Sequence, residues 1–78
     1  MISIKLFGIT RDIVGQPILD IEAKIETVAE LKTFMISAYP RMEGLNSLMV
    51  AVNSEYAQDD VAIRSTDEIA LIPPVSGG

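Results

Sequence analysis

Cysteine and histidine are both missing from the 78 residues of the chain. Their absence excludes disulfides, thiolate nucleophiles and most sites for transition metals, and it removes the side chain that most often serves as a general base. The reactive side chains that remain are carboxylates, lysines and hydroxyls. We therefore expect no metal site and no catalysis by this chain alone, which favours a function that depends on its surface or its backbone.

Long apolar runs and an excess of basic residues are also missing. Although 49% of the residues are hydrophobic, no run is long enough to span a bilayer and no apolar segment follows a basic start as in a signal peptide, so we expect a cytoplasmic protein. The net charge of −5 disfavours binding to nucleic acid or to an anionic membrane. The acidic surplus either steers the chain toward a partner with a basic face or only keeps it soluble.

Alternating apolar residues predict several strands. Strands are expected over residues 2–7, 17–23, 48–52 and 68–72, with a short strand or a turn over 61–63. In the second of these, Leu19, Ile21 and Ala23 share one face. Residues 9–14 are expected to form a loop or a single helical turn that ends at Gly15, and residues 53–60 a turn.

One main helix is predicted after Thr27. Thr27 and Glu30 form a capping box, in which the hydroxyl and the carboxylate each accept a hydrogen bond from an otherwise unpaired backbone N–H. Pro40 ends the helix near Tyr39. Apolar residues recur at helical spacing and form one buried stripe, namely Val28, Leu31, Phe34, Met35 and Ala38. Residues 41–47 are expected to form a loop.

The order of these elements predicts an α+β fold in which one main helix packs on one face of a mixed sheet. By analogy this is the ubiquitin-like β-grasp fold, whose first and last strands are parallel neighbours. We expect one such domain over residues 1–74 and a flexible tail over residues 75–78 that carries two glycines.

The residues after the last expected strand form the most informative segment of the sequence. They read Pro73, Pro74, Val75, Ser76, Gly77 and Gly78. The two prolines favour an extended conformation, and the two glycines lack a Cβ, so the segment can enter a narrow channel and leave a carbonyl open to attack. Four residues beyond Pro74 reach roughly 13 to 14 Å when extended. The alternative is a frayed end or a cloning remnant.

Three segments resemble one known family, the small subunits of molybdopterin synthase, which are ubiquitin-like sulfur carriers. Residues 7–12, Phe-Gly-Ile-Thr-Arg-Asp, are similar to the family's Phe-Ala-x-x-Arg-Glu. The other two are Val-Ala-Val-Asn at 50–53 followed by Tyr-Ala at 56–57, and the run from Asp67 to Gly78 that contains Pro-Pro-x-x-Gly-Gly. Thr66 departs from the family, which usually has Gly before Asp-Glu, and this puts the turn geometry in doubt.

The resemblance implies a carrier whose catalytic side chains belong to its partners. In the family, a ubiquitin-activating-like adenylyltransferase uses ATP to adenylate the residue that corresponds to Gly78. A sulfur donor then converts it to a thiocarboxylate. The tail enters the large subunit of the synthase, where the sulfur passes to cyclic pyranopterin monophosphate. The resemblance therefore implies that the chain binds no cofactor of its own.

Three other functions remain open from the sequence. A sulfur carrier for thiamine synthesis or tRNA thiolation would share the fold and the glycines, although its tail usually lacks Pro-Pro-Val-Ser. A ubiquitin-like protein modifier would form isopeptide bonds through Gly78. A plain β-grasp binding module would give no role to Gly77 and Gly78.

Strand parity predicts where a partner binds. Ile4 and Leu6 point toward the helix, so Phe7 should point away from it, and by the same alternation Ile72 should too. If the first and last strands are neighbours, these two side chains lie together on the uncovered face, with Tyr56 extending the patch and Arg11 at its rim. The alternative is a twisted strand end that tucks Phe7 into the core.

Overall fold

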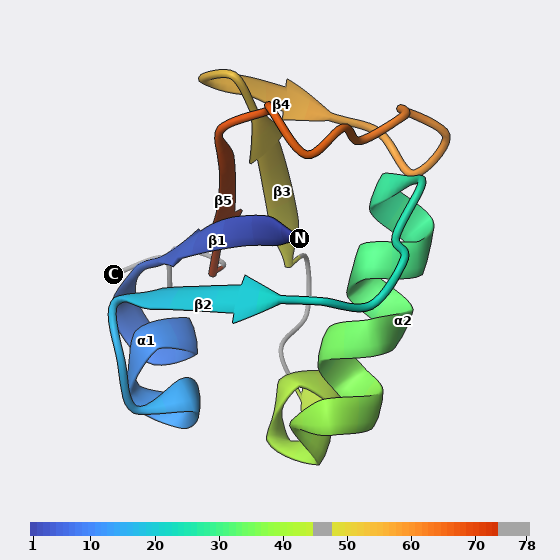
Figure 1. The fold of residues 1–78 in the computed structure, drawn as a ribbon. Helices are drawn as coiled ribbons and strands as arrows, with labels where there is room; N and C mark the ends of the chain where they lie inside the picture. Colours follow the sequence, from blue (N-terminus) through green and yellow to red (C-terminus); the bar gives the residue numbers. More distant parts are fainter. Residues whose placement is uncertain (45–47, 74–78) are drawn as a thin grey trace.

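The computed structural model describes residues 1–44 and 48–73. Five strands form one mixed sheet in the order β2-β1-β5-β3-β4 (Figure 1). β1 (Ile2–Leu6) and β5 (Ile69–Ile72) are parallel neighbours, whereas β2 (Ile18–Ile21), β3 (Met49–Val52) and β4 (Glu55–Ala57) each pair antiparallel with their neighbours. This arrangement confirms the predicted α+β, β-grasp layout.

The main helix, α2 (Val28–Ala38), packs on one face of the sheet. Its N-terminus is capped as predicted, because the Glu30 N–H donates to Thr27 Oγ1 at 3.2 Å. The second half of the predicted capping box differs, because the Glu30 carboxylate accepts from the backbone N–H of Glu26, at 3.2 Å, and not from that of Thr27. Tyr39 caps the C-terminus directly before Pro40.

The predicted helix stripe is largely correct, with one error. Val28, Leu31 and Met35 are fully buried against the inward side chains of the strands, and Phe34 is half-buried. Ala38 is exposed, because it lies in the last turn of α2, where the chain leaves the sheet. Ala23, expected in the second strand, is also exposed because β2 ends at Ile21.

The expected loop over residues 41–47 is wrong in its first part. Residues Pro40–Gly44 form a 3₁₀-helix, η1, in which the Met42 N–H donates to the Tyr39 carbonyl at 2.8 Å. Met42 is buried in the core as a result. Residues 45–47 lie outside the described residues.

The additional strand lies in a different place from the one expected. β4 covers residues 55–57, within the segment predicted to be a turn, because Asn53 and Ser54 adopt positive φ angles of 53° and 69° and turn the chain back along β3. Residues 61–63 instead run beside the start of α2. There the Val61 carbonyl accepts from the Val28 N–H at 3.0 Å, and Ile63 enters the core.

The short helix α1 (Gly8–Val14) connects β1 to β2. It ends as predicted at Gly15, whose φ of 90° is readily adopted only by glycine and whose N–H donates to the Arg11 carbonyl at 2.8 Å. No helix within the described ranges 1–44 and 48–73 is both long and apolar enough to cross a membrane.

Candidate functional site

The face of the sheet opposite α2 has no element packed on it in the described part of the chain, and we call it the open face (Figure 1). Strand register identifies its side chains, because Ile18, Lys5, Ala70, Ala51 and Tyr56 stand opposite one another in successive strands. A second row pairs Ile72 with Met49, and Phe7 follows β1 on the same side. Six large hydrophobic residues are exposed within residues 1–44 and 48–73, and four of them, Phe7, Ile18, Met49 and Tyr56, lie on this one face.

Three of the four predicted partner-binding residues come together there. Phe7, Tyr56 and Ile72 line one shallow pocket of about 360 Å³. The remaining lining residues are Lys5, Ala51, Ser54, Glu68 and Ala70. Phe7 is 50% exposed and Tyr56 67%, while Ile72 is half-buried, so the alternative in which Phe7 tucks into the core is excluded.

Arg11 does not line this pocket. It lies exposed on α1 beside a different hollow, which it shares with Asp12 and Gly15. Its place at the rim of a partner interface therefore stays a prediction. Pro74, Val75, Ser76, Gly77 and Gly78, with the predicted boundary at residue 74, lie outside the described residues.

The buried hydroxyl of Thr10 fixes the position of Phe7. Thr10 Oγ1 accepts from the Phe7 N–H at 3.1 Å, donates to the Phe7 carbonyl at 2.6 Å, and lies 3.4 Å from the Leu71 carbonyl. Thr10 is fully buried, so these bonds are shielded from water. One side chain thus ties the end of β1 to the end of β5.

Gly8 is a site residue that the sequence did not identify. Its φ is +55°, and a Cβ at this position would lie 3.0 Å from Pro73 Cγ. Glycine therefore allows the Pro73 ring to pack directly over the start of α1. The only sequence signal was that Gly8 replaces the alanine of the family motif.

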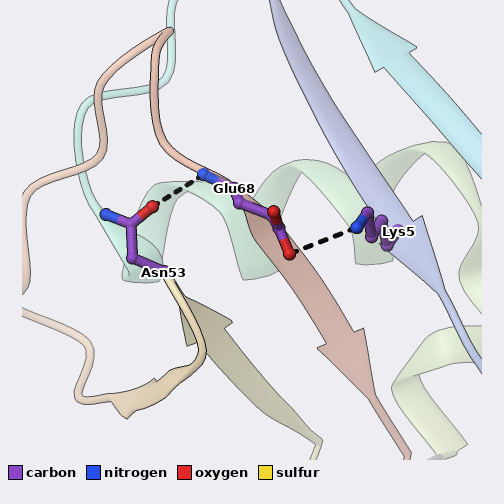
Figure 2. Close-up of polar contacts among 3 residues, drawn as sticks. All are labelled: Lys5, Asn53 and Glu68. Atoms are coloured by element: carbon purple, nitrogen blue, oxygen red, sulfur yellow. Dashed lines mark hydrogen bonds and ion pairs between the residues drawn. The ribbon is translucent and has the colours of Figure 1, made fainter.

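A charged network borders the pocket and was also missed. Lys5 Nζ and Glu68 Oε1 form an ion pair of 3.1 Å across β1 and β5, and Asn53 Oδ1 accepts from the Glu68 N–H at 2.9 Å (Figure 2). Asn53 also donates to Asp67 Oδ1 at 3.0 Å. The Asp67 carboxylate accepts hydrogen bonds from the Arg64 backbone N–H and from the Asn53 side-chain amide. These bonds stabilise the ionised form and lower the pKa of Asp67.

The exposed apolar side chains of the open face form a surface that another protein could contact. No group of three or more acidic side chains that could hold a metal ion is present within residues 1–44 and 48–73. A larger hollow, of about 630 Å³, contains none of the predicted site residues. The described residues offer instead an apolar face beside Pro73, from which the sequence continues to Gly77 and Gly78.

Comparison with known proteins places the chain in a family. The model of the ThiS family matches residues 4–78. The molybdopterin synthase sulfur carrier subunit of Arabidopsis thaliana is 33% identical over 79 residues, which cover 99% of this chain and 82% of the relative. The protein of the same description from Escherichia coli (strain K12) is 32% identical over 82 residues, which cover 100% of both chains.

Solved structures share the fold. SAMP1 from Haloferax volcanii superposes with a TM-score of 0.79 at 28% identity, over 99% of this chain and 98% of that chain. A chain of the complex between subunits 1 and 2 of the molybdopterin-converting factor from Helicobacter pylori has a TM-score of 0.66 at 23% identity, over 99% and 97%. With a family match over residues 4–78 and relatives of more than 30% identity, the chain belongs to the ThiS family.

Proposed function

We propose that the chain is the sulfur carrier subunit of a molybdopterin synthase. The proposal rests on the similarity of this chain, along its whole sequence, to proteins described as molybdopterin synthase sulfur carrier subunits. The open apolar face beside Pro73 supports it, because a carrier needs a surface on which its partner can dock near the group that it carries.

Gly78 is the proposed site of the chemistry. A free α-carboxyl has a pKa of about 3.3 to 3.7 and is an unreactive anion at neutral pH. An activating enzyme would form an acyl-adenylate from this carboxylate and ATP, with release of pyrophosphate. A sulfur donor would then displace AMP and leave a thiocarboxylate. ATP is thus used by the adenylyltransferase, and the proposal implies a cytoplasmic location, where ATP is available.

The large subunit of the synthase is the proposed partner for the transfer. The Helicobacter pylori structure is a complex of subunits 1 and 2 of the molybdopterin-converting factor. In our proposal the large subunit covers Phe7, Tyr56 and Ile72, accepts residues 74–78, and passes the sulfur to cyclic pyranopterin monophosphate. Burial of a side chain such as Phe or Ile contributes roughly 1.5 to 3 kcal/mol. Arg11 adds a charge at the rim worth about 1 kcal/mol or less.

A second candidate function is protein modification. It is favoured by the similarity to SAMP1, because a further Haloferax volcanii structure of this fold is that of small archaeal modifier protein 1. A modifier would be recovered from cells as covalent adducts on many proteins. A carrier would be recovered as the free chain, with one oxygen atom of Gly78 exchanged for sulfur.

Deletion of Gly78 tests the proposed function. In a reaction that contains an adenylyltransferase, ATP, a sulfur donor, the purified large subunit and cyclic pyranopterin monophosphate, the truncated chain should fail to support molybdopterin synthesis. Its melting temperature should not change, since glycine has no side chain to contribute to a core. Ser76→Ala is the control and should retain activity. Molybdopterin formation by the truncated chain would contradict the proposal.

A further inference from the structure

We infer that the Lys5–Glu68 ion pair lies inside the interface with the large subunit. Both groups stay charged when they are buried there, so the pair carries no net charge. The inference rests on the proposed function. It assigns the pair a role in specificity, because the surface that covers it must be apolar and must carry no charge of its own at that point.

The position of the pair within the sheet is the first observation. Lys5 lies on β1 and Glu68 directly precedes β5, and these are two of the three strands that have neighbours on both sides. Both side chains line the same pocket as Phe7 and Tyr56. A partner that contacts Phe7 at the end of β1 and Tyr56 on β4 crosses β5 beside Ala70, the residue opposite Lys5, and in our inference its surface extends over the pair.

The surroundings of Lys5 are the second observation. Ile18 stands opposite it on β2 and Ala70 opposite it on β5. Phe7 lies two residues further along β1. These three neighbours are apolar, whereas on the other side of Lys5 the Ser3 hydroxyl, on the same face of β1, donates to the Asp20 carboxylate on β2. The ammonium group has a carboxylate only 3.1 Å away, and this leaves a docking partner no need to supply one (Figure 2).

Glu68 is held in place before any partner binds. The Asn53 side chain accepts from its backbone N–H at 2.9 Å, and the Asn53 N–H donates to its carbonyl at 2.7 Å. In the free chain the side chains of Lys5 and Glu68 are 48% and 61% exposed, so water screens the pair and it contributes little to stability. Under a covering partner the two charges lose this water, and removal of either one would leave the other buried without a counter-charge.

This difference between the free and the bound chain gives a direct test. The affinity of the full-length chain for the purified large subunit is measured by calorimetry for wild type, Lys5→Met, Glu68→Gln and the double variant. Each single variant should bind about tenfold or more weakly, and the double variant should recover to within about threefold of wild type. The melting temperatures of all three free variants should stay near that of wild type.

A second ion pair in the same chain is the matched control. Lys32 Nζ and Asp59 Oδ1 are 2.7 Å apart on the side of the molecule that carries α2. Lys32→Met and Asp59→Asn make the same chemical changes there and should leave the affinity unchanged.

Two results would overturn the inference and leave the proposed function intact. If wild type binds and neither Lys5 nor Glu68 matters, the pair lies outside the interface. If Lys5→Met weakens binding and Glu68→Gln does not, Lys5 pairs with a carboxylate of the partner. Failure of the wild-type chain to bind the large subunit at all would instead refute the proposed function together with this inference.

Discussion

Thr10 and Gly8 position the residues next to the proposed carrier segment. The Thr10 hydroxyl is hydrogen-bonded to the backbone N–H and carbonyl of Phe7, and Gly8 leaves space for the Pro73 ring. Thr10 acts through hydrogen bonds from its hydroxyl to backbone groups, and Gly8 acts through the absence of a Cβ. Neither effect produces a recognisable pattern in the sequence. Phe7 and Ile72 could be placed from the sequence, because strand parity alone decides their face.

The Lys5–Glu68 pair could not be predicted for a related reason. The two residues are 63 positions apart, and their contact depends on the register between β1 and β5. The alternation of side chains along a strand shows on which face of the sheet a residue lies. It does not show which residue of the neighbouring strand stands beside it.

At the residue scale, Gly77→Ala tests whether the segment passes through a narrow channel. The substitution adds one methyl group next to the reacting carbonyl, and a small displacement there can cost on the order of 100-fold in rate. We expect slower formation or transfer of the thiocarboxylate, measured by mass spectrometry in single-turnover reactions, with no change in melting temperature.

Ser76→Ala is the control for Gly77→Ala, since it removes an oxygen atom and adds no bulk. It should react at close to the wild-type rate. Wild-type rates for Gly77→Ala would show that no tight channel surrounds this residue.

At the scale of elements, the long periodic segments were predictable and the short ones were not. The helix from Val28 and the strands around Ile4 and Leu71 follow from repeated apolar spacing. β4 has only three residues, and its position depends on the positive φ angles of Asn53 and Ser54. Three residues are too few to show an alternating pattern, and turn-forming residues obscure it further.

Met42 and Met49 test the difference between a core element and the open face. Met42 in η1 is 1% exposed, whereas Met49 on β3 is 41% exposed. Met42→Ala should lower the free energy of unfolding by about 2 to 5 kcal/mol, because it leaves a cavity in the core. Met49→Ala should change it by about 0.5 kcal/mol or less.

Chemical denaturation of the two variants measures this difference. A Met42→Ala variant as stable as Met49→Ala would mean that η1 does not contribute to the core.

At the scale of the whole molecule, the two faces of the sheet have different tasks. One face packs against α2 and holds the fold together, while the other presents Phe7, Tyr56 and Ile72 beside Pro73. The division follows from strand alternation, and the sequence alone was therefore enough to place Phe7 and Ile72 on the same open face.

Phe7→Ala and Ile72→Ala, made separately, test the task of the open face. Each should weaken binding to the large subunit by about tenfold or more. The melting temperature should change little for exposed Phe7, and somewhat more for half-buried Ile72. Phe34→Ala on α2 is the control with the opposite signature, a lower melting temperature and unchanged affinity.

Calorimetry with the large subunit and thermal denaturation of the free chains provide the two readouts. A large thermal destabilisation by Phe7→Ala without loss of affinity would place Phe7 in the core and remove it from the docking face.

Intact-mass spectrometry of the chain purified from cells tests most directly whether Gly78 carries sulfur. Without the large subunit, we expect a population in which one oxygen atom of the Gly78 carboxylate is replaced by sulfur. After incubation with the large subunit and cyclic pyranopterin monophosphate, this population should return to the unmodified mass while molybdopterin forms. A chain that never gains sulfur in cells with an active adenylyltransferase, or that keeps its sulfur during the incubation, would contradict the carrier function.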